Sequence, residues 1–243
     1  MKLGAVIPVY NHGHAVGAVV RAIRAQGLPV LLVDDGSDAA CAAVLDSLVA
    51  PDVHLHRLAV NQGKGGAVMA GLRAAQKTLS WTHALQIDAD GQHDAADIPK
   101  FAAAAAAHPE HFICGCPIYD ESVPKARLYG RYATHVWVWI NTLSMAIRDS
   151  MCGFRVYPLA AVLPLIDSVS IGRRMDFDTE VAVRLYWRGV PVINQPTRVS
   201  YPTDGVSHFH ALQDNLLISW MHTRLFFGML LRLPLLLWRK VAA

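Results

Sequence analysis

The sequence is poor in charge, and its basic residues form no dense stripe. Only 17% of its 243 residues are Asp, Glu, Lys or Arg, and the formal net charge is +3. Nucleic-acid-binding domains usually carry a concentrated basic patch, often with interleaved aromatic residues. The sequence therefore predicts no nucleic-acid partner.

Cysteine is also scarce, and its spacing excludes a zinc site. The four cysteines are Cys41, Cys114, Cys116 and Cys152. A zinc ribbon or finger needs two pairs with longer internal gaps, and no second pair accompanies Cys114 and Cys116. We expect four free thiols in or near the core, in a reducing compartment.

Three further signatures are missing. Residues 8–13 read Pro-Val-Tyr-Asn-His-Gly where a dinucleotide oxidoreductase would have Gly-x-Gly-x-x-Gly after its first strand. Lys64 lies in a glycine-rich loop without the spacing of a P-loop. The amino-terminal apolar run is too short for a signal peptide and is already used as a strand, so we expect no secretion signal.

Strand and helix patterns alternate along the chain. Its 53% hydrophobic content and 26.6 kDa suit one large α/β domain. We expect strands at 2–8, 29–34, 53–59, 82–88, 111–116, 152–157 and 190–199, and helices at 14–26, 39–49, 65–79, 95–107, 125–147, 176–188 and from about 210. This order predicts a mostly parallel sheet with helices on both faces.

The most informative segment is Asp-Ala-Asp-Gly-Gln-His at 88–93, which follows a buried strand. Two carboxylates at the carboxyl end of a strand lie where an open α/β sheet binds its ligand. Mg²⁺ commonly combines one or two carboxylates with substrate phosphates. The segment therefore suggests a metal that holds a diphosphate, although Asp is equally common in turns and helix caps.

Three other loops follow the same design. The first strand runs into Asn11, and the second ends in Asp34 and Asp35, with Ser37 placed to cap the next helix. Lys64 lies near a third helix start, where backbone N–H groups attract anions. Four such loops on one edge of a parallel sheet indicate a nucleotide site.

Together these segments resemble family 2 glycosyltransferases, and most closely the polyprenyl-phosphate (dolichyl-phosphate) mannose and glucose synthases. The matching runs are Ile-Pro-Val-Tyr-Asn at 7–11, Val-Asp-Asp-Gly-Ser at 33–37, Asn-Gln-Gly-Lys-Gly at 61–65, residues 88–93, and Cys-Gly-Phe-Arg at 152–155. They occur in the family's order across about residues 3–200, whereas the remaining tail does not match.

The resemblance implies an α/β fold of the GT-A type, a nucleotide-diphospho-sugar transferase sandwich with a mostly parallel central sheet. It implies an inverting glycosyltransferase that uses Mg²⁺ or Mn²⁺. Asp90 would bind the metal, with Gln92 as a further ligand and Asp88 on the metal or the ribose. The nucleotide-sugar donor would be held by Pro8, Tyr10, Asn11, Asp35, Lys64 and Asp88.

Basic residues further along suggest how an acceptor is held. Arg127 and Arg131 are four apart and share a helix face, where they could clamp a phosphate together with Arg155. In the resembling synthases, arginines of this region hold the acceptor's phosphate. This chain departs from the pattern at 115–117, where Gly-Cys-Pro replaces Gly-Ser-Arg, and a solvated helix edge remains the alternative.

Two acidic residues are candidates for the general base. A hydroxyl acceptor needs a base to take its proton, whereas a phosphate acceptor does not. Asp178 is the preferred base and Glu180 the second. Two residues apart on a helix, they point in different directions, and structural pairing with nearby arginines is the alternative.

The tail suggests contact with a membrane. Residues 216–238 are almost wholly apolar, and Arg224, Arg232 and Arg239 fall on one side of a helix. Such a helix suits the membrane interface, with the arginines reaching water. Packing on the sheet or in a dimer is the alternative.

We therefore expect a transferase domain at 1–209 and an interfacial helix at 210–243, at the cytoplasmic face of the membrane, acting on a lipid-linked acceptor. His208, in a loop at 201–210, is a possible further ligand of the metal or the diphosphate. A non-catalytic relic that binds a membrane or a partner remains the alternative function.

Overall fold

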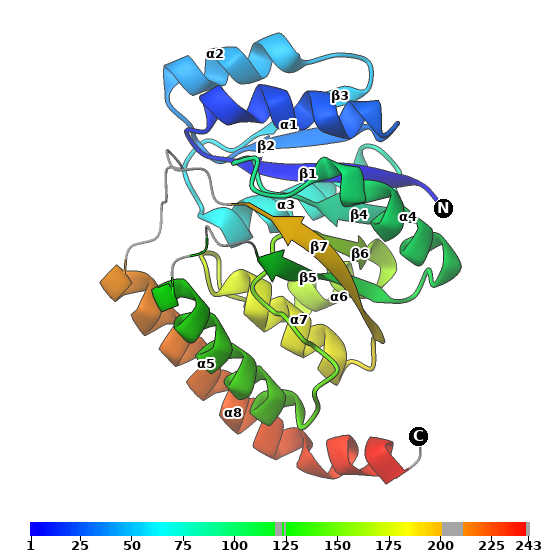
Figure 1. Ribbon diagram of the computed structural model, residues 1–243, viewed down its shortest axis with the longest axis vertical. Coiled ribbons are helices and arrows are strands. Elements are labelled where there is room, and N and C mark those ends of the chain that lie inside the picture. The colour runs from blue at the N-terminus through cyan, green and yellow to red at the C-terminus, as the bar shows by residue number, and fades with distance from the viewer. Residues whose placement is uncertain (120–122, 124, 201–210, 242–243) are drawn as a thin grey trace.

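The computed structural model describes residues 1–119, 123, 125–200 and 211–241. A seven-stranded sheet lies at its centre, in the order β3-β2-β1-β4-β6-β5-β7 (Figure 1). The strands are β1 (Leu3–Val9), β2 (Val30–Asp34), β3 (Val53–Arg57), β4 (His83–Gln86), β5 (Phe112–Tyr119), β6 (Arg155–Pro158) and β7 (Val192–Val199). Neighbouring strands are parallel except at β6, which runs antiparallel to both β4 and β5. The predicted mostly parallel sheet is confirmed.

Helices cover both faces of the sheet (Figure 1). They are α1 (Gly13–Ala25), α2 (Ala39–Leu48), α3 (Lys64–Lys77), α4 (Ile98–Ala107) after a short 3₁₀ turn (Ala95–Asp97), α5 (Lys125–Thr142), α6 (Leu159–Ser168), α7 (Phe177–Trp187) and α8 (Ala211–Val241). Residues alternate between two hydrophobic clusters along β1, where Ala5 and Ile7 face α1, α2 and α4 while Val6 faces the side of α3, α6 and α7. This two-sided burial is typical of parallel sheets.

Several predicted boundaries were wrong. Helix 125–147 ends at Thr142, because Leu143 takes a positive φ of 51° and leaves the helix. The strand predicted at 152–157 begins only at Arg155. Helix α6 was not predicted, since Pro164 in its middle disguises the pattern.

The cap predicted for Ser37 belongs to its neighbour. Asp38 is the N-cap of α2, and its side chain accepts a hydrogen bond from the Cys41 N–H at 2.8 Å. The Ser37 hydroxyl instead accepts from the Asn11 N–H, at 3.2 Å. It thereby joins the loops that follow β1 and β2.

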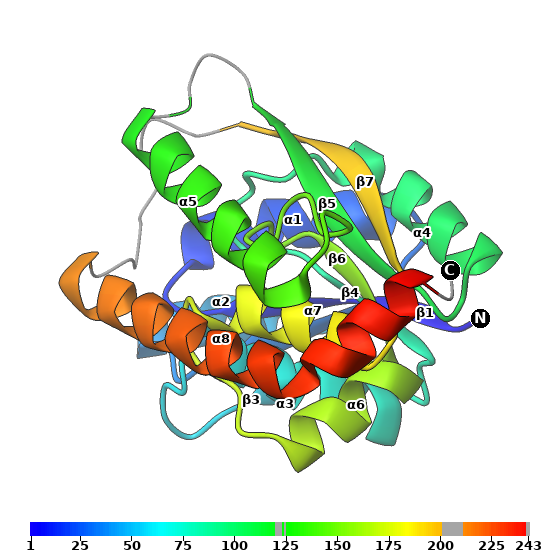
Figure 2. The same ribbon diagram turned by 90° about the horizontal axis from the view of Figure 1, so that it is seen from below.

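Helix α8 packs along α5 and α7 (Figures 1 and 2). Met221, Leu225, Met229 and Leu236 are buried in the cluster that also contains residues of α5 and α7. The helix is long and apolar enough to cross a membrane by length and composition alone. Its near side is thus part of the protein core, as the packed-helix alternative requires.

Candidate functional site

The loops after β1 and β2 lie beside each other at the carboxyl edge of the sheet. Pro8 pairs with Val33 in register, and Tyr10 is exposed just beyond the strand. Asn11 has a positive φ of 55°, and its side-chain oxygen accepts from the Asp38 N–H at 2.9 Å. Three residues predicted to hold a nucleoside therefore lie at the end of β1 and in the turn that follows it.

Asp34 and Asp35 have different surroundings. Burial alone would raise the pKa of Asp34, but hydrogen bonds from Ser37 and Arg57 lower it. Asp35 is 2% exposed and accepts from the Gln62 N–H at 2.7 Å, and burial raises the pKa of this carboxyl. Asp34 is therefore structural, whereas Asp35 ties the β2 loop to the loop before α3.

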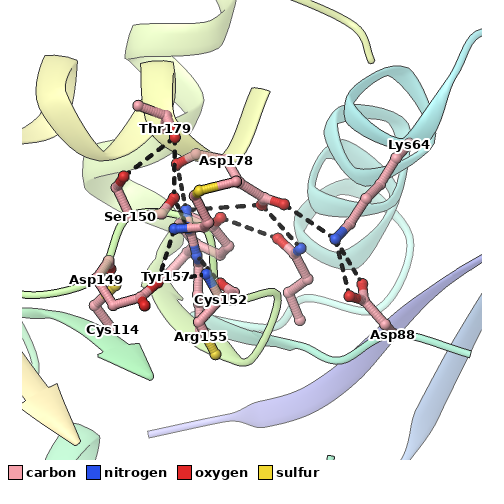
Figure 3. Close-up of polar contacts among 12 residues, drawn as sticks. Lys64, Asp88, Cys114, Asp149, Ser150, Cys152, Arg155, Tyr157, Asp178 and Thr179 are labelled. Carbon is pink, nitrogen blue, oxygen red and sulfur yellow. Dashed lines mark hydrogen bonds and ion pairs between the residues drawn. The ribbon is translucent and has the colours of Figure 1, made fainter. Parts of the chain in front are cut away.

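The centre of the edge is a lysine between two carboxylates (Figure 3). Lys64 Nζ lies 2.9 Å from Asp88 Oδ1 and 3.0 Å from Asp178 Oδ2. Burial alone would raise the pKa of Asp88, but Lys64 and His93 lower it below the ordinary value. Both acids are therefore held within a few ångströms of one cation, although they come from the loop after β4 and from α7.

Glycines allow this close approach. A Cβ at Gly153 would lie 2.3 Å from Asp88 Oδ2. A Cβ at Gly65 would lie 2.4 Å from that of Phe177, the first residue of α7. Real Cβ atoms do not come so close, so these glycines let the loop before β6 reach Asp88 and let α7 reach the start of α3.

Asp90 is a carboxylate without a cation partner among the described residues. Its Oδ1 accepts from the Gln92 N–H at 3.0 Å. Burial and the charge of Asp88 together raise the pKa of Asp90. His93 Nε2 lies 3.8 Å from Asp88 Oδ2, too far for a hydrogen bond.

This donor set fits a divalent cation shared with a diphosphate. Within the ranges that the structure describes, no three His, Cys, Asp or Glu side chains form a closed metal site. A half-buried carboxylate that has no cation partner in the described part of the chain, beside a second acid, suits Mg²⁺ or Mn²⁺, which take oxygen ligands and leave positions for phosphate and water. The metal prediction for Asp88, Asp90 and Gln92 stays a prediction.

Asp178 is embedded in a buried polar network (Figure 3). Its Oδ1 accepts from Gln86 Nε2 at 3.1 Å, and the Tyr157 hydroxyl donates to Gln86 Oε1 at 3.0 Å. The tyrosine thus fixes which end of the amide faces Asp178. We did not predict Gln86 or Tyr157, although a glutamine inside an apolar strand is a usable signal.

The predicted role of Arg155 in phosphate binding is wrong. Arg155 is 0% exposed, and its guanidinium donates to the carbonyl oxygens of Cys152, Ser150 and Asp178 at 2.5–2.6 Å. A buried arginine with these partners cannot reach an acceptor. It joins β6, the loop before it and α7.

Arg131 is also engaged. Its Nη2 and Nε donate to the two oxygens of the Asp149 carboxylate, at 2.7 and 2.5 Å, and His135 Nε2 lies 3.3 Å from the same carboxylate. This pair anchors α5 to the loop before β6, so it does not offer a free phosphate clamp. The side chain of Arg127, like all of His208, lies outside the described residues.

Glu180 is a structural carboxylate and not a second base. It is 0% exposed, lies 2.7 Å from Arg184 and 3.1 Å from Arg224, and accepts from the Gly172 N–H at 2.9 Å. As expected for residues two apart on a helix, it points away from Asp178. Its partners join α7 to α8.

The arginines of α8 face the protein, contrary to the prediction that they reach water. Arg224 pairs with Glu180, Arg232 lies 4.7 Å over the Trp187 ring, and Arg239 donates to the Trp187 carbonyl at 3.1 Å. The outward side of α8 is consequently apolar. Helix α7 supplies a carboxylate, a ring and a carbonyl that satisfy all three.

The predicted placement of the cysteines in or near the core is confirmed. All four are free thiols, with Cys41, Cys114 and Cys152 buried and Cys116 partly so. None belongs to the arrangement around Lys64.

Comparisons with known proteins agree with this geometry. Residues 5–162 match the family model described as glycosyl transferase family 2. The chain is 24% identical over 177 residues to a dolichyl-phosphate beta-glucosyltransferase of Dictyostelium discoideum, covering 67% of this chain and 52% of the relative. It is 33% identical over 113 residues to an undecaprenyl-phosphate 4-deoxy-4-formamido-L-arabinose transferase of an Enterobacter species, covering 43% of this chain and 33% of the relative. The chain thus spans about half or less of these two relatives.

A solved structure shares the fold. It is glucosyl-3-phosphoglycerate synthase from Mycobacterium tuberculosis, in complex with Mn²⁺, uridine diphosphate and glucosyl-3-phosphoglycerate. The TM-score is 0.63 at 14% identity, over 95% of this chain and 78% of the other. The sandwich described above is therefore the GT-A fold. With the family model matching well over half of the sequence, the chain belongs to glycosyl transferase family 2 and is a glycosyltransferase.

Proposed function

We propose that the protein is a metal-dependent, inverting glycosyltransferase that moves a sugar from a nucleotide donor to a lipid-linked or membrane-associated acceptor. The observation that carries this proposal is the contact of Lys64 with Asp88 and Asp178 at 2.9 and 3.0 Å, beside the Asp90 carboxylate, for which the described residues offer no cation partner. The names of the relatives support it, since two act on dolichyl or undecaprenyl phosphate and the structural neighbour binds Mn²⁺ and uridine diphosphate.

The donor would lie along the sheet edge. Pro8, Tyr10, Asn11 and Asp35 would hold the nucleoside, and Lys64 would contact the diphosphate. Asp90 would bind the divalent metal, with Asp88 and Gln92 beside it, and the bound metal would neutralise charge on the departing diphosphate. An amine within reach of both Asp88 and Asp178 is well placed to stabilise that charge as well.

Asp178 would act on the acceptor. If the acceptor attacks through a hydroxyl, the new bond forms to the anomeric carbon as the bond to the diphosphate oxygen breaks, and the hydroxyl proton passes to the Asp178 carboxylate. Direct displacement inverts the anomeric centre. Gln86 and Lys64 hold the two oxygens of this carboxylate, so its orientation is fixed before the acceptor arrives.

The test is titration with uridine and guanosine diphosphates, with and without Mn²⁺ or Mg²⁺. We expect Asp90→Ala to lose metal-dependent binding. The matched control is Asp94→Ala, because Asp94 lies nearby but only caps the 3₁₀ turn by accepting from the Ala96 N–H at 2.9 Å. Equal metal-dependent binding by wild type and Asp90→Ala would contradict the site. Equal background hydrolysis of nucleotide sugars by both would favour the non-catalytic alternative.

The proposed membrane contact rests on the outward face of α8, at the cytoplasmic surface. Phe227, Leu231 and Trp238 are 62%, 84% and 66% exposed, respectively. Exposed apolar patches of this kind commonly mark interaction sites, and tryptophan favours the membrane interface. Neighbouring α5 adds Tyr132 and Trp137, 60% and 44% exposed.

The membrane test changes the outward side chains, because deleting α8 would open the core it helps to form. We expect a Phe227→Ser, Leu231→Ser, Trp238→Ser variant to leave the membrane fraction while keeping its thermal stability. The control is Val49→Ser and Val60→Ser, two exposed apolar residues remote from α8 in sequence. Continued sedimentation of the triple variant with membranes would contradict the proposal.

A further inference from the structure

A groove lies between the loop at 170–176 and the first half of α8. It has a volume of about 370 Å³, and its lining includes Ile171, Arg173, Arg174, Leu217, Trp220 and Arg224. Volumes in this range are typical of small-molecule sites. The arginines predicted to hold a phosphate, Arg131 and Arg155, are engaged elsewhere. The groove is a different part of the structure in which arginines lie close together.

The groove presents cations and hides their counter-ions. Arg174 pairs with Asp214 at 3.3 Å, but the arginine side chain is 34% exposed and the aspartate 0%. Arg224 pairs with Glu180 at 3.1 Å, with exposures of 31% and 0%. The buried acids hold the guanidinium groups in place. Asp176 also lines the groove but is only 4% exposed, so the side chains that a ligand would meet are mainly cationic.

Two donors in the groove have no partner among the described residues. Arg173 is exposed and forms no ion pair there. The Nε of Arg224 is buried and lacks a hydrogen-bond partner. Planar guanidinium groups match phosphate oxygens well, so the exposed guanidinium of Arg173 is suited to an anionic headgroup.

The groove continues into the apolar face of α8. Trp220, which lines it, is 60% exposed, and Leu216 and Phe227 on the same helix are 64% and 62% exposed. A ligand with its phosphate at Arg173 could therefore lay its chains along α8. That combination of a phosphate and apolar chains describes a phospholipid.

We propose that this groove binds the phosphate headgroup of an anionic membrane phospholipid. The proposal rests on the membrane association put forward above and adds a headgroup site to it. The groove is also connected to the proposed nucleotide-sugar site, since the Arg173 carbonyl accepts a hydrogen bond from the Gly66 N–H of α3 at 3.0 Å. Seating a lipid in the groove thus fixes the loop that packs against the start of the Lys64 helix.

The test compares the full-length protein and its variants on vesicles of phosphatidylcholine with and without phosphatidylglycerol. We expect Arg173→Gln to lower binding to the anionic vesicles about fivefold, the usual contribution of one basic residue near such a surface. Binding to phosphatidylcholine alone should not change. Trp220→Ala should weaken binding to both vesicle types.

Two control substitutions separate a built site from diffuse attraction. Arg21→Gln removes an exposed arginine of α1, which packs on the other face of the sheet, and should have no effect. Lys240→Gln removes an exposed cation at the far end of α8 and should have a smaller effect than Arg173→Gln. A short-chain phosphatidylglycerol below its micellar concentration should bind the wild type and not Arg173→Gln, whereas inorganic phosphate should not compete.

The proposal is overturned if Arg173→Gln and Lys240→Gln lose binding equally and the short-chain lipid does not bind. Competition by inorganic phosphate would assign the groove to a free anion and also overturn it. Titration of Arg173→Gln with uridine diphosphate and Mn²⁺ keeps the two proposals apart. If Arg173→Gln still binds the donor but no longer binds the lipid, the substitution has affected only the groove. If the wild type shows no metal-dependent nucleotide binding, only the transferase proposal is contradicted.

Discussion

The carboxyl edge of the sheet and the α5–α8 helix pair use charge in opposite ways. At the edge, Asp88 and Lys64 face each other with side chains 23% and 19% exposed, so a ligand can reach them. On α8, the arginines turn toward α7 and leave Leu231 and Trp238 outside. The regular spacing of arginines on a helix therefore identifies one face but does not say whether that face meets water or protein.

The largest effect expected at the edge is from Asp178→Asn. Loss of a general base typically lowers kcat by about 10²–10⁴-fold. Binding of the nucleotide should be retained, because the amide keeps the shape of the side chain. Product formation from a nucleotide sugar and a membrane extract measures kcat, with Asp167→Asn as the control at an exposed site. An unchanged kcat would mean that the acceptor is already an anionic nucleophile.

On the helix side, the largest expected effect is on stability. Glu180→Gln should cost about 3 kcal/mol of unfolding free energy, because it leaves Arg184 and Arg224 without their buried carboxylate. Arg24→Gln is the matched control, since its pair with Asp52 is 44% exposed on both sides and should contribute little to stability. Denaturant titration measures both. Equal losses of unfolding free energy would show that the buried ion pairs of Glu180 contribute no more than an exposed pair.

The same helix pair predicts a pH dependence. His222 of α8 lies 3.3 Å from Asn141 of α5 and stacks near Trp137, and desolvation lowers its pKa from 6.5 to about 4. The unfolded chain takes up the proton near pH 6.5 and the folded chain only near pH 4. Stability from this group is therefore complete above pH 6.5 and falls by roughly 3 kcal/mol toward pH 4.

Comparing His222→Gln with wild type isolates this group from the carboxylates that titrate in the same range. The difference in unfolding free energy between the two proteins should shrink as the pH falls from 6.5 to 4. A constant difference would show that folding does not lower the pKa of His222.

The smallest expected effect is again at the carboxyl edge of the sheet. It concerns the close approach of the Gly153 backbone to the Asp88 carboxylate. Gly153→Ala would place a Cβ against the Asp88 carboxylate and should weaken metal-dependent nucleotide binding about tenfold, as expected for moderate overpacking. Gly130→Ala is the control, because nothing lies within 4 Å of a Cβ there. Isothermal titration compares the two. Equal affinities would mean that the loop before β6 moves aside freely.

The edge was more predictable from sequence than the helix pair. The loops of Asp35, Lys64 and Asp88 each follow a strand directly, so local pattern and the geometry of parallel sheets bring them together. The contact between Lys64 and Asp178 joins residues far apart in the sequence, and no local pattern encodes it. The fold class followed from alternation, whereas the Pro164 helix did not.

The site predictions that failed concern charged residues that are buried in the structure. Arg155 and Glu180 look like site residues in sequence, and only the packed structure shows that their partners are carbonyls and other arginines. Likewise, nothing local distinguishes an arginine that meets the Trp187 ring from one that reaches water. Charged residues therefore need a tertiary neighbour before a role can be assigned.

The membrane attachment proposed for the apolar outer side of α8 would have a kinetic consequence. An enzyme held by that side would search for its acceptor in two dimensions, so its turnover would follow the mole fraction of acceptor among the surrounding lipids. Diluting the acceptor with inert detergent at constant bulk concentration would then slow the reaction. Adding more vesicles of the same composition would leave the rate per bound enzyme unchanged.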